Sequence, residues 1–136
     1  MTAAPRFAGK GVDQGHSGSA LPIGTPLGDF DVVGVIRQGG FGIVYEGVDR
    51  QSRRQVAIKE YLPATLAGRM ADGNVVVRSL RHQQAYREGM QGFLTEARTL
   101  AVLAEPALVR VLHYWEQHGT AYLAMPLHQG RSLKDA

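Results

Sequence analysis

Cysteine is absent from this sequence of 136 residues. That absence excludes disulfide bonds and zinc sites built on thiolates, and it is consistent with a reducing cytoplasm. Long apolar runs are also missing. No stretch is long enough to span a bilayer, and the N-terminus has no apolar signal core. We therefore expect a cytoplasmic protein with no membrane segment in this chain.

Runs of basic residues are missing as well. The formal net charge is +3, and the 15 Lys and Arg residues are scattered rather than interleaved with aromatic residues. This pattern does not favour a nucleic-acid partner. The five histidines show no metal-ligand arrangement, so no metal site is expected in this chain. With 44% apolar and 20% charged residues, the composition is typical of one ordinary globular domain.

The N-terminal region differs in composition from the rest. Residues 1–26 are rich in Gly, Ala, Ser and Pro and show no apolar period. Such a composition is typical of a flexible leader. We expect order to begin at Leu27 and residues 27–136 to form one domain.

A short apolar run that ends in a lysine is the most informative stretch. It reads Val56-Ala57-Ile58-Lys59, and its β-branched residues predict a buried strand. An ammonium group is rarely found in such a place without a partner, because removing it from water is costly. The sequence therefore raises the question of which anion Lys59 faces.

A glycine-rich turn lies upstream, over residues 38–42. Glycines let backbone N–H groups come close to a ligand, and such a loop can surround phosphates. No helix follows the turn, as in dinucleotide-binding folds, and no Gly-Lys-Ser/Thr closes it, as in a Walker loop. Instead the residues from Ile43 to Val48 read as a strand. The result is a hairpin of strand, glycine turn and strand, followed by the strand that carries Lys59.

This arrangement resembles the N-terminal lobe of a Ser/Thr protein kinase of the kind found in bacteria. The family pattern is G-x-G-x-x-G-x-V. Gly39, Gly42 and Val44 match its second glycine, third glycine and valine, whereas Arg37 stands at the first glycine position. The resemblance covers residues 27–136, which end just past the segment corresponding to the hinge between the lobes. It implies an α+β fold with a five-stranded antiparallel sheet and one main helix.

The expected strands follow from apolar and β-branched runs, and they lie at about residues 30–36, 43–48, 55–59, 109–116 and 120–125. Residues 60–80 are longer than the usual link between the third strand and the helix. Within them, Asp72-Gly73 followed by Val75-Val76-Val77 predicts a β-hairpin insertion. Two interpretations of the insertion remain open: a surface elaboration, or a docking site for a partner or for the other lobe.

Apolar residues at helical spacing predict the main helix. We expect it to begin near Gln91, after an earlier helical piece over residues 82–88, because Gly89 and Gly92 weaken the pattern between them. The kinase pattern Phe-x-x-Glu-Ala-x-x-Leu recurs here and implies that Glu96 forms an ion pair with the strand lysine. Taken alone, Glu96 would be a solvated helix charge.

The resemblance also implies an ATP site. Lys59 would hold the α- and β-phosphates and Glu96 would orient Lys59, so these two are the expected catalytic residues. The remaining expected contacts to ATP are the glycine turn and its flanks, two residues that press on the adenine, and the gatekeeper and hinge: Ile36, Arg37, Gln38, Gly39, Gly40, Phe41, Gly42, Val44, Ala57, Met125, Pro126, Leu127 and His128.

The sequence contains no His-Arg-Asp loop and no Asp-Phe-Gly motif, so it lacks the catalytic aspartate and the main metal ligand of a kinase. We interpret it as the ATP-binding N-lobe of a kinase of bacterial signalling. The full-length parent would transfer the ATP γ-phosphate to protein Ser/Thr, with Mg²⁺ and with substrates bound through the missing C-lobe. The fragment alone is expected to be inactive.

Two alternatives remain open. One is a free-standing kinase-like module that docks on a protein partner. The other is a small β-barrel that binds nucleic acid through aromatic residues on its strands, which would leave the glycine turn unexplained.

Overall fold

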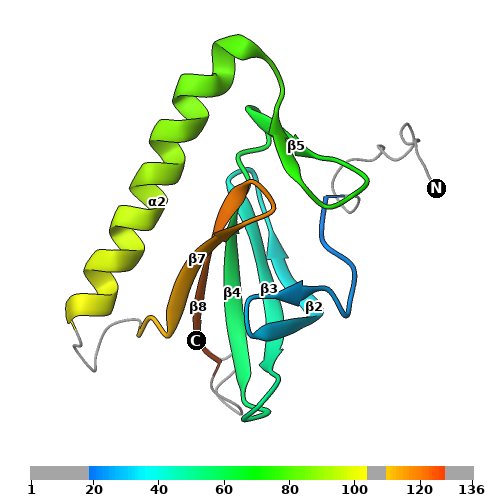
Figure 1. Cartoon of the computed structure of the whole chain (residues 1–136), viewed down its shortest axis with the longest axis vertical. Coiled ribbons are helices and arrows are strands. Elements are labelled where there is room, and N and C mark those ends of the chain that lie inside the picture. Colours follow the sequence, from blue (N-terminus) through cyan, green and yellow to red (C-terminus); the bar gives the residue numbers. More distant parts are fainter. Residues whose placement is uncertain (1–18, 104–109, 128–136) are drawn as a thin grey trace.

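The computed structural model describes residues 19–103 and 110–127. Figure 1 shows an antiparallel sheet in the centre, one long helix beside it and a small hairpin near one end of the sheet. The α+β class, the antiparallel sheet and the single main helix agree with the prediction. In the described ranges, no helix is long and apolar enough to cross a membrane.

The sheet has six strands in the order β1-β2-β3-β4-β8-β7, and every neighbouring pair is antiparallel. Its strands are β1 (Pro26–Leu27), β2 (Phe30–Gln38), β3 (Gly42–Asp49), β4 (Gln55–Tyr61), β7 (His113–Gln117) and β8 (Thr120–Pro126). The predicted number of five was wrong, because the short β1 folds back on the start of β2 and pairs Leu27 with Phe30. In the described residues the strand predicted over 109–116 begins at His113.

The main helix, α2 (Gln83–Leu103), is continuous and follows one 3₁₀ turn, η2 (Leu80–His82). The expected interruption at the two glycines does not occur. A glycine in a helix costs about 1 kcal/mol relative to alanine, but Gly89 lies where the helix meets β4. A side chain at Gly89 would overlap the hydroxyl of Tyr61. That hydroxyl donates a hydrogen bond to the carbonyl of Tyr86 (2.9 Å), so the glycine makes room for a contact that attaches the helix to the sheet.

Residues 62–79, between β4 and η2, are called the insertion from here on. They contain a separate antiparallel hairpin of β5 (Ala67–Arg69) and β6 (Val75–Val77). Gly73 lies between these two strands with φ of 93°, a conformation that glycine adopts readily. The hairpin thus occupies the stretch in which the Asp-Gly signal predicted one.

Alternation along β4 divides its side chains between the two faces of the sheet. Ile58 and Glu60 lie on one face, together with Tyr45 and Tyr122 of the neighbouring strands. We call this the covered face, because its side chains are buried beneath the N-terminal segment and the insertion. Tyr61 lies on the opposite face, which we call the helix face, since its ring packs against the aromatic rings of α2.

The N-terminal part of the described chain helps to bury the covered face. Leu21 is only 4% exposed, and its N–H donates to the Tyr45 hydroxyl (3.0 Å). The N–H of Gly24 donates to the carbonyl of Val32 (2.7 Å). Residues 19–26, which were expected to belong to a flexible leader, therefore pack against the sheet. Residues 1–18 lie outside the described part.

The two edge strands of the sheet meet through Gln117. Its side-chain oxygen accepts from the N–H of Gly28 (3.0 Å), and its amide nitrogen donates to the carbonyl of Pro26 (3.2 Å). Trp115 of β7 packs beside Phe30 at a ring distance of 5.9 Å. The sheet is therefore curved around its covered face, whose side chains are mostly apolar and buried.

Candidate nucleotide-binding face

The strand register brings several of the predicted site residues together on the helix face. Val44 lies opposite Lys59, and Lys59 lies opposite Leu123. In the next row, Ala57 lies opposite Met125. Directly opposite side chains in an antiparallel pair lie on the same face, with Cβ atoms about 4.5–5.5 Å apart. Three strands thus contribute to one group of side chains.

This group has an apolar base and one exposed cation. Ala57 and Leu123 are each 5% exposed, whereas Val44 and Met125 are partly buried. The side chain of Lys59 is exposed and makes no ion pair with any described residue. An apolar surface with a few polar groups is the usual lining of a ligand site. The arrangement can accept a flat apolar group beside an anion.

The expected ion pair between Lys59 and Glu96 is not formed. Glu96 lies on α2 with its side chain exposed, and the ion pairs found among the described residues join other side chains. The physical reason lies in the layer between helix and sheet. The ring of Tyr61 lies 5.3 Å from that of Tyr86 and 5.9 Å from that of Phe93, so α2 packs on aromatic rings and Glu96 faces solvent.

The glycine turn connects β2 and β3 at the end of the sheet nearest the insertion. The N–H of Gly39 donates to the carbonyl of Gly42 (2.9 Å). A side chain at Gly42 would overlap the backbone carbonyl of Glu60, whereas one at Gly39 or Gly40 would meet nothing within 4 Å. Glycine is therefore required at Gly42 by the neighbouring strand, and the tip of the turn is open. Phe41 at that tip is 86% exposed.

The flanks of the turn and the hinge lie at the margins of this face. Arg37 is exposed and opposite Val44, so it continues the row that contains Lys59. Gln38 pairs with Ile43, and Ile36 lies in the irregular part of the β2–β3 register. At the hinge, Pro126 is opposite Val56.

Leu127 donates its N–H to the carbonyl of Gln55 (3.2 Å). His128 lies outside the described residues. The described part of the predicted hinge thus continues the pairing of β8 with β4.

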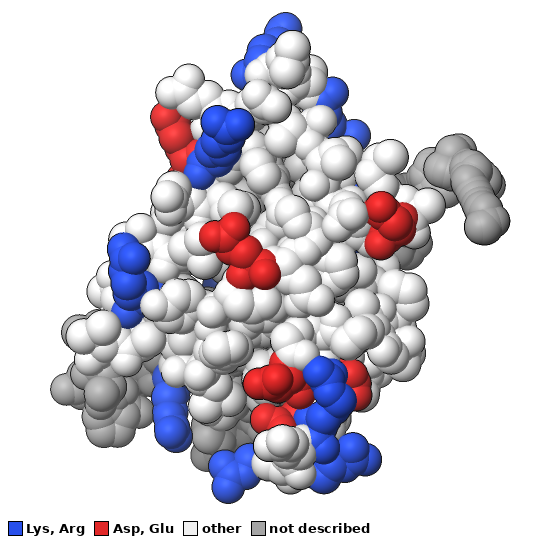
Figure 2. All heavy atoms as spheres, viewed as in Figure 1, with Lys and Arg blue, Asp and Glu red and all other residues white. Residues whose placement is uncertain are grey.

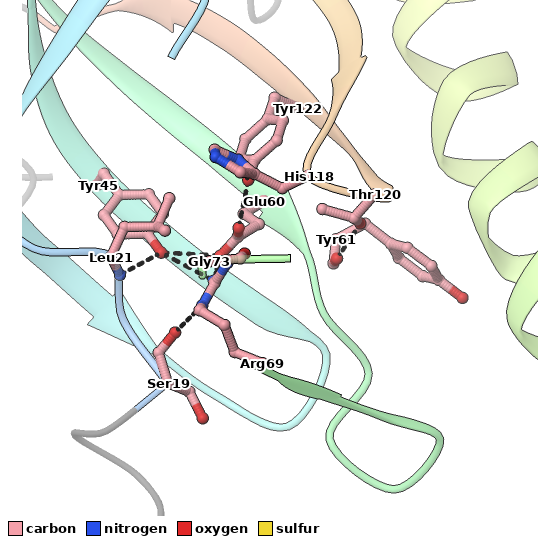
Figure 3. Close-up of polar contacts among 10 residues, drawn as sticks. All are labelled: Ser19, Leu21, Tyr45, Glu60, Tyr61, Arg69, Gly73, His118, Thr120 and Tyr122. Carbon is pink, nitrogen blue, oxygen red and sulfur yellow. Dashed lines mark hydrogen bonds and ion pairs between the residues drawn. The ribbon is translucent and has the colours of Figure 1, made fainter. Parts of the chain in front are cut away.

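A buried charged cluster on the covered face was not predicted (Figure 3). Glu60, whose side chain is 0% exposed, accepts a hydrogen bond from each of two tyrosine hydroxyls: Tyr45 (2.8 Å) and Tyr122 (2.6 Å). Its third partner is the guanidinium of Arg69, at 2.5 Å, and that side chain is only 6% exposed. Every oxygen of this carboxylate is therefore satisfied inside the protein, as a buried charge requires.

The surroundings of the cluster shift the pKa values of its members. Burial, followed by the charge of Glu60, raises the pKa of both Tyr45 and Tyr122 well above the ordinary value. Burial alone would lower the pKa of Arg69, but the charge of Glu60 and the neighbouring tyrosines raise it. Burial and the nearby charge of Arg69 lower the pKa of His118, whose Nδ1 lies 3.0 Å from the Tyr122 hydroxyl. The cluster thus keeps its two tyrosines neutral.

One sequence signal could have indicated this cluster. Glu60 is in phase with Val56 and Ile58, so it belongs on the buried side of β4 if the strand continues past Lys59. Its partner Arg69 could not have been chosen from the sequence, because the path of the insertion decides which arginine reaches it.

Figure 2 shows Lys and Arg interspersed with Asp and Glu over the face viewed, between large uncharged areas. Within the described ranges, no three His, Asp or Glu residues are arranged to hold a metal ion. The candidate site is the helix face beside the glycine turn. Among the described residues it includes no metal-ligand group.

Comparison with known proteins finds similar sequences among protein kinases. The serine/threonine-protein kinase PknD of Mycobacterium tuberculosis is 30% identical over 116 residues, which are 85% of this chain. The serine/threonine-protein kinase Pkn2 of Myxococcus xanthus is 32% identical over 109 residues, which are 79% of this chain. The homologues of this chain are serine/threonine protein kinases. No protein-family model matches it.

The match covers only a small part of those kinases. The chain spans 15% of the length of the mycobacterial protein and 11% of the myxobacterial one. A solved structure described as the PpkA-294 apo form is similar over 86% of this chain and 42% of its own length, with a TM-score of 0.79 and 40% identity. The chain therefore corresponds in sequence and fold to one portion of larger proteins.

Proposed function

We propose that this chain is the ATP-binding N-terminal lobe of a serine/threonine protein kinase. The observation that carries the proposal is the row of Val44, Lys59 and Leu123 on the helix face, next to the glycine turn. It combines an exposed cation with an apolar base in a chain whose homologues are kinases. Its five main strands, the helix and the insertion would be those of a kinase N-lobe.

In this proposal the adenine lies against Val44 and Ala57, and Lys59 binds the α- and β-phosphates. Backbone N–H groups at the tip of the glycine turn donate to the phosphate oxygens, because glycine allows the close approach. The hinge contributes the carbonyl of Pro126 and the N–H of His128 to the adenine edge. Glu96 orients Lys59 once the two side chains come together, a step that requires movement from the arrangement described above.

The reaction requires parts that this sequence does not contain. ATP is bound with Mg²⁺, and the aspartates that hold the metal and activate the substrate hydroxyl belong to motifs absent from these residues. The chain would supply the groups that position the phosphates of ATP, and it would bind ATP weakly, because half of the nucleotide cleft is exposed. Transfer to protein Ser or Thr is thus proposed for a longer parent protein.

The first test is nucleotide binding by the chain and its Lys59→Met variant. We expect the substitution to lower ATP affinity by about 10-fold or more, since a charge-assisted contact contributes about 1.5–3 kcal/mol. Its effect on the free energy of unfolding should stay within about 0.5 kcal/mol, because Lys59 is exposed and forms no ion pair with a described residue. Arg37→Gly, in the same row but two strands away on β2, is the control, and it should change the affinity by a small factor at most. Equal ATP affinity for Lys59→Met and the unchanged chain would contradict the proposal.

The second test is the gene sequence beyond Ala136. Downstream His-Arg-Asp and Asp-Phe-Gly motifs would support a kinase, and Lys59→Met in that parent should then abolish phosphotransfer. A stop codon at that point would instead support a free-standing module that docks on a protein partner.

A further inference from the structure

The insertion is hydrogen-bonded directly to the tip of the glycine turn. The N–H of Leu62 donates to the carbonyl of Phe41 (3.0 Å), and the N–H of Ala64 donates to the carbonyl of Gly40 (2.8 Å). The Phe41 side chain points into solvent, and Gly40 has no side chain to pack. The tip is therefore held to the rest of the described fold by backbone hydrogen bonds from the insertion.

Ala64 is itself fixed on both sides. Its carbonyl accepts from Nε of Arg78 (2.8 Å), at the far end of the insertion. The N–H of Arg78 donates to the carbonyl of Leu66 (2.7 Å), and the N–H of Leu66 donates to that of Pro63 (2.9 Å). A closed set of hydrogen bonds thus sets the position of the N–H group that reaches Gly40.

The insertion is anchored to the sheet by the buried cluster. Arg69 pairs with Glu60, and its guanidinium also donates to the carbonyls of Ser19 (2.6 Å) and Gly73 (2.8 Å). The N–H of Val75 donates to the carbonyl of His118 (2.8 Å). These contacts attach the insertion to three separate parts of the fold, so it forms a fixed support rather than a loose surface loop.

The bonds leave a particular set of groups available at the tip. The carbonyls of Gly40 and Phe41 are taken by the insertion, while in the described chain the N–H groups of these two residues donate to no other residue. Carbonyl oxygens repel phosphate and N–H groups attract it. The insertion therefore orients the tip with its repelling groups occupied and its attracting groups free.

We propose that the insertion is a strap that holds the glycine turn ready to bind phosphate, anchored by the ion pair of Arg69 and Glu60. Holding a loop in its binding conformation removes part of the ordering cost of binding. The role in nucleotide binding rests on the proposed function, whereas the ordering of the turn does not.

The test is Ala64→Pro. Ala64 is the second residue of the turn from Pro63 to Leu66, a position that proline favours, so the change removes the N–H donor and places a ring carbon against the Gly40 carbonyl. Ala64→Ser keeps the donor and is the matched control. Backbone order parameters at Gly40 and Phe41, measured by nuclear magnetic resonance, should fall from about 0.85 toward 0.6 in Ala64→Pro only. Amide exchange of Leu62 should quicken about 2- to 10-fold, the equivalent of one hydrogen bond.

A second variant acts from a distance. Arg78→Met removes the Nε donor that holds the Ala64 carbonyl and leaves the Ala64 N–H in place. Because Arg78 is exposed, the fold should persist, and order at Gly40 should fall by less than in Ala64→Pro. If the order parameters of Gly40 and Phe41 in both variants equal those in Ala64→Ser, the proposal that the insertion holds the glycine turn is wrong.

ATP titration of the same proteins separates the two proposals. If ATP binds, Ala64→Pro should weaken the binding about 2- to 10-fold relative to Ala64→Ser. Unchanged or tighter binding despite a disordered tip would overturn the strap's role in binding phosphate. If the unchanged chain does not bind ATP, the proposed function fails, and the order parameters still decide whether the insertion orders the turn.

Discussion

Lys59 and Glu60 are neighbours on β4, yet the protein treats their charges in opposite ways. The ammonium of Lys59 lies exposed on the helix face without a described ion-pair partner. The carboxylate of Glu60 is fully buried on the covered face with three partners. The covered face is completed by the chain itself, whereas the helix face carries an exposed cation. Two neighbouring charges of one strand thus have opposite surroundings: solvent around Lys59, and buried partners around Glu60.

Arg69→Met is expected to lower the free energy of unfolding more than any other change proposed for this chain. It would leave the Glu60 carboxylate buried without its cation, which typically costs about 3–5 kcal/mol. Urea unfolding should show that loss, or the chain should fail to fold. The double variant Glu60→Met with Arg69→Met is the control: it leaves no buried charge, so it should lose less stability than Arg69→Met, although the Tyr45 and Tyr122 hydroxyls lose their acceptor. A double variant no more stable than Arg69→Met would mean that the ion pair itself holds the insertion.

Raising the pH above 10 is expected to have the next largest effect on the stability of the fold. The pKa values of Tyr45 and Tyr122 are raised above the unfolded value of 10.0 by burial and by Glu60. Their contribution to stability is therefore complete below pH 10 and is lost as the pH rises beyond it. Tyrosinate absorbance from these two residues should appear only with unfolding. In Tyr122→Phe, the increase in tyrosinate absorbance that accompanies unfolding should be smaller. Ionisation of Tyr45 and Tyr122 while the chain is still folded would contradict their burial.

Protonation of His118 at acidic pH should have the smallest effect on the stability of the fold. Burial and Arg69 lower the pKa of His118 below its ordinary 6.5. The contribution of the neutral ring is then complete above pH 6.5 and is lost as the pH falls through the lower folded value. Glu60 and Asp72 act in the opposite direction, which limits the effect. His118→Asn suits the φ of 57° at this position, and its unfolding free energy should depend less on pH between 6.5 and 5. An unchanged pH dependence would mean that His118 does not contribute.

The sequence was sufficient to place Val44, Ala57 and Lys59 on one face, but it was insufficient for the expected Lys59–Glu96 ion pair and for the covered face. Val44, Ala57 and Lys59 could be placed together because their strands alternate regularly and a glycine turn fixes which strands are neighbours. The contacts of Arg69 and of Leu21 depend on how the insertion and the N-terminal segment cross the sheet, and no local pattern encodes that path. The continuity of α2 was missed because Gly89 acts through packing against Tyr61 rather than through helix propensity.

The contact between Gly89 and Tyr61 also limits how this protein can change. Because the tyrosine hydroxyl occupies the space of any side chain at position 89, neither residue is free to vary alone. A larger residue at 89 requires a smaller one at 61, and a smaller one at 61 removes the bridge to the Tyr86 carbonyl. Related sequences that keep this helix in place should therefore substitute both positions together or neither.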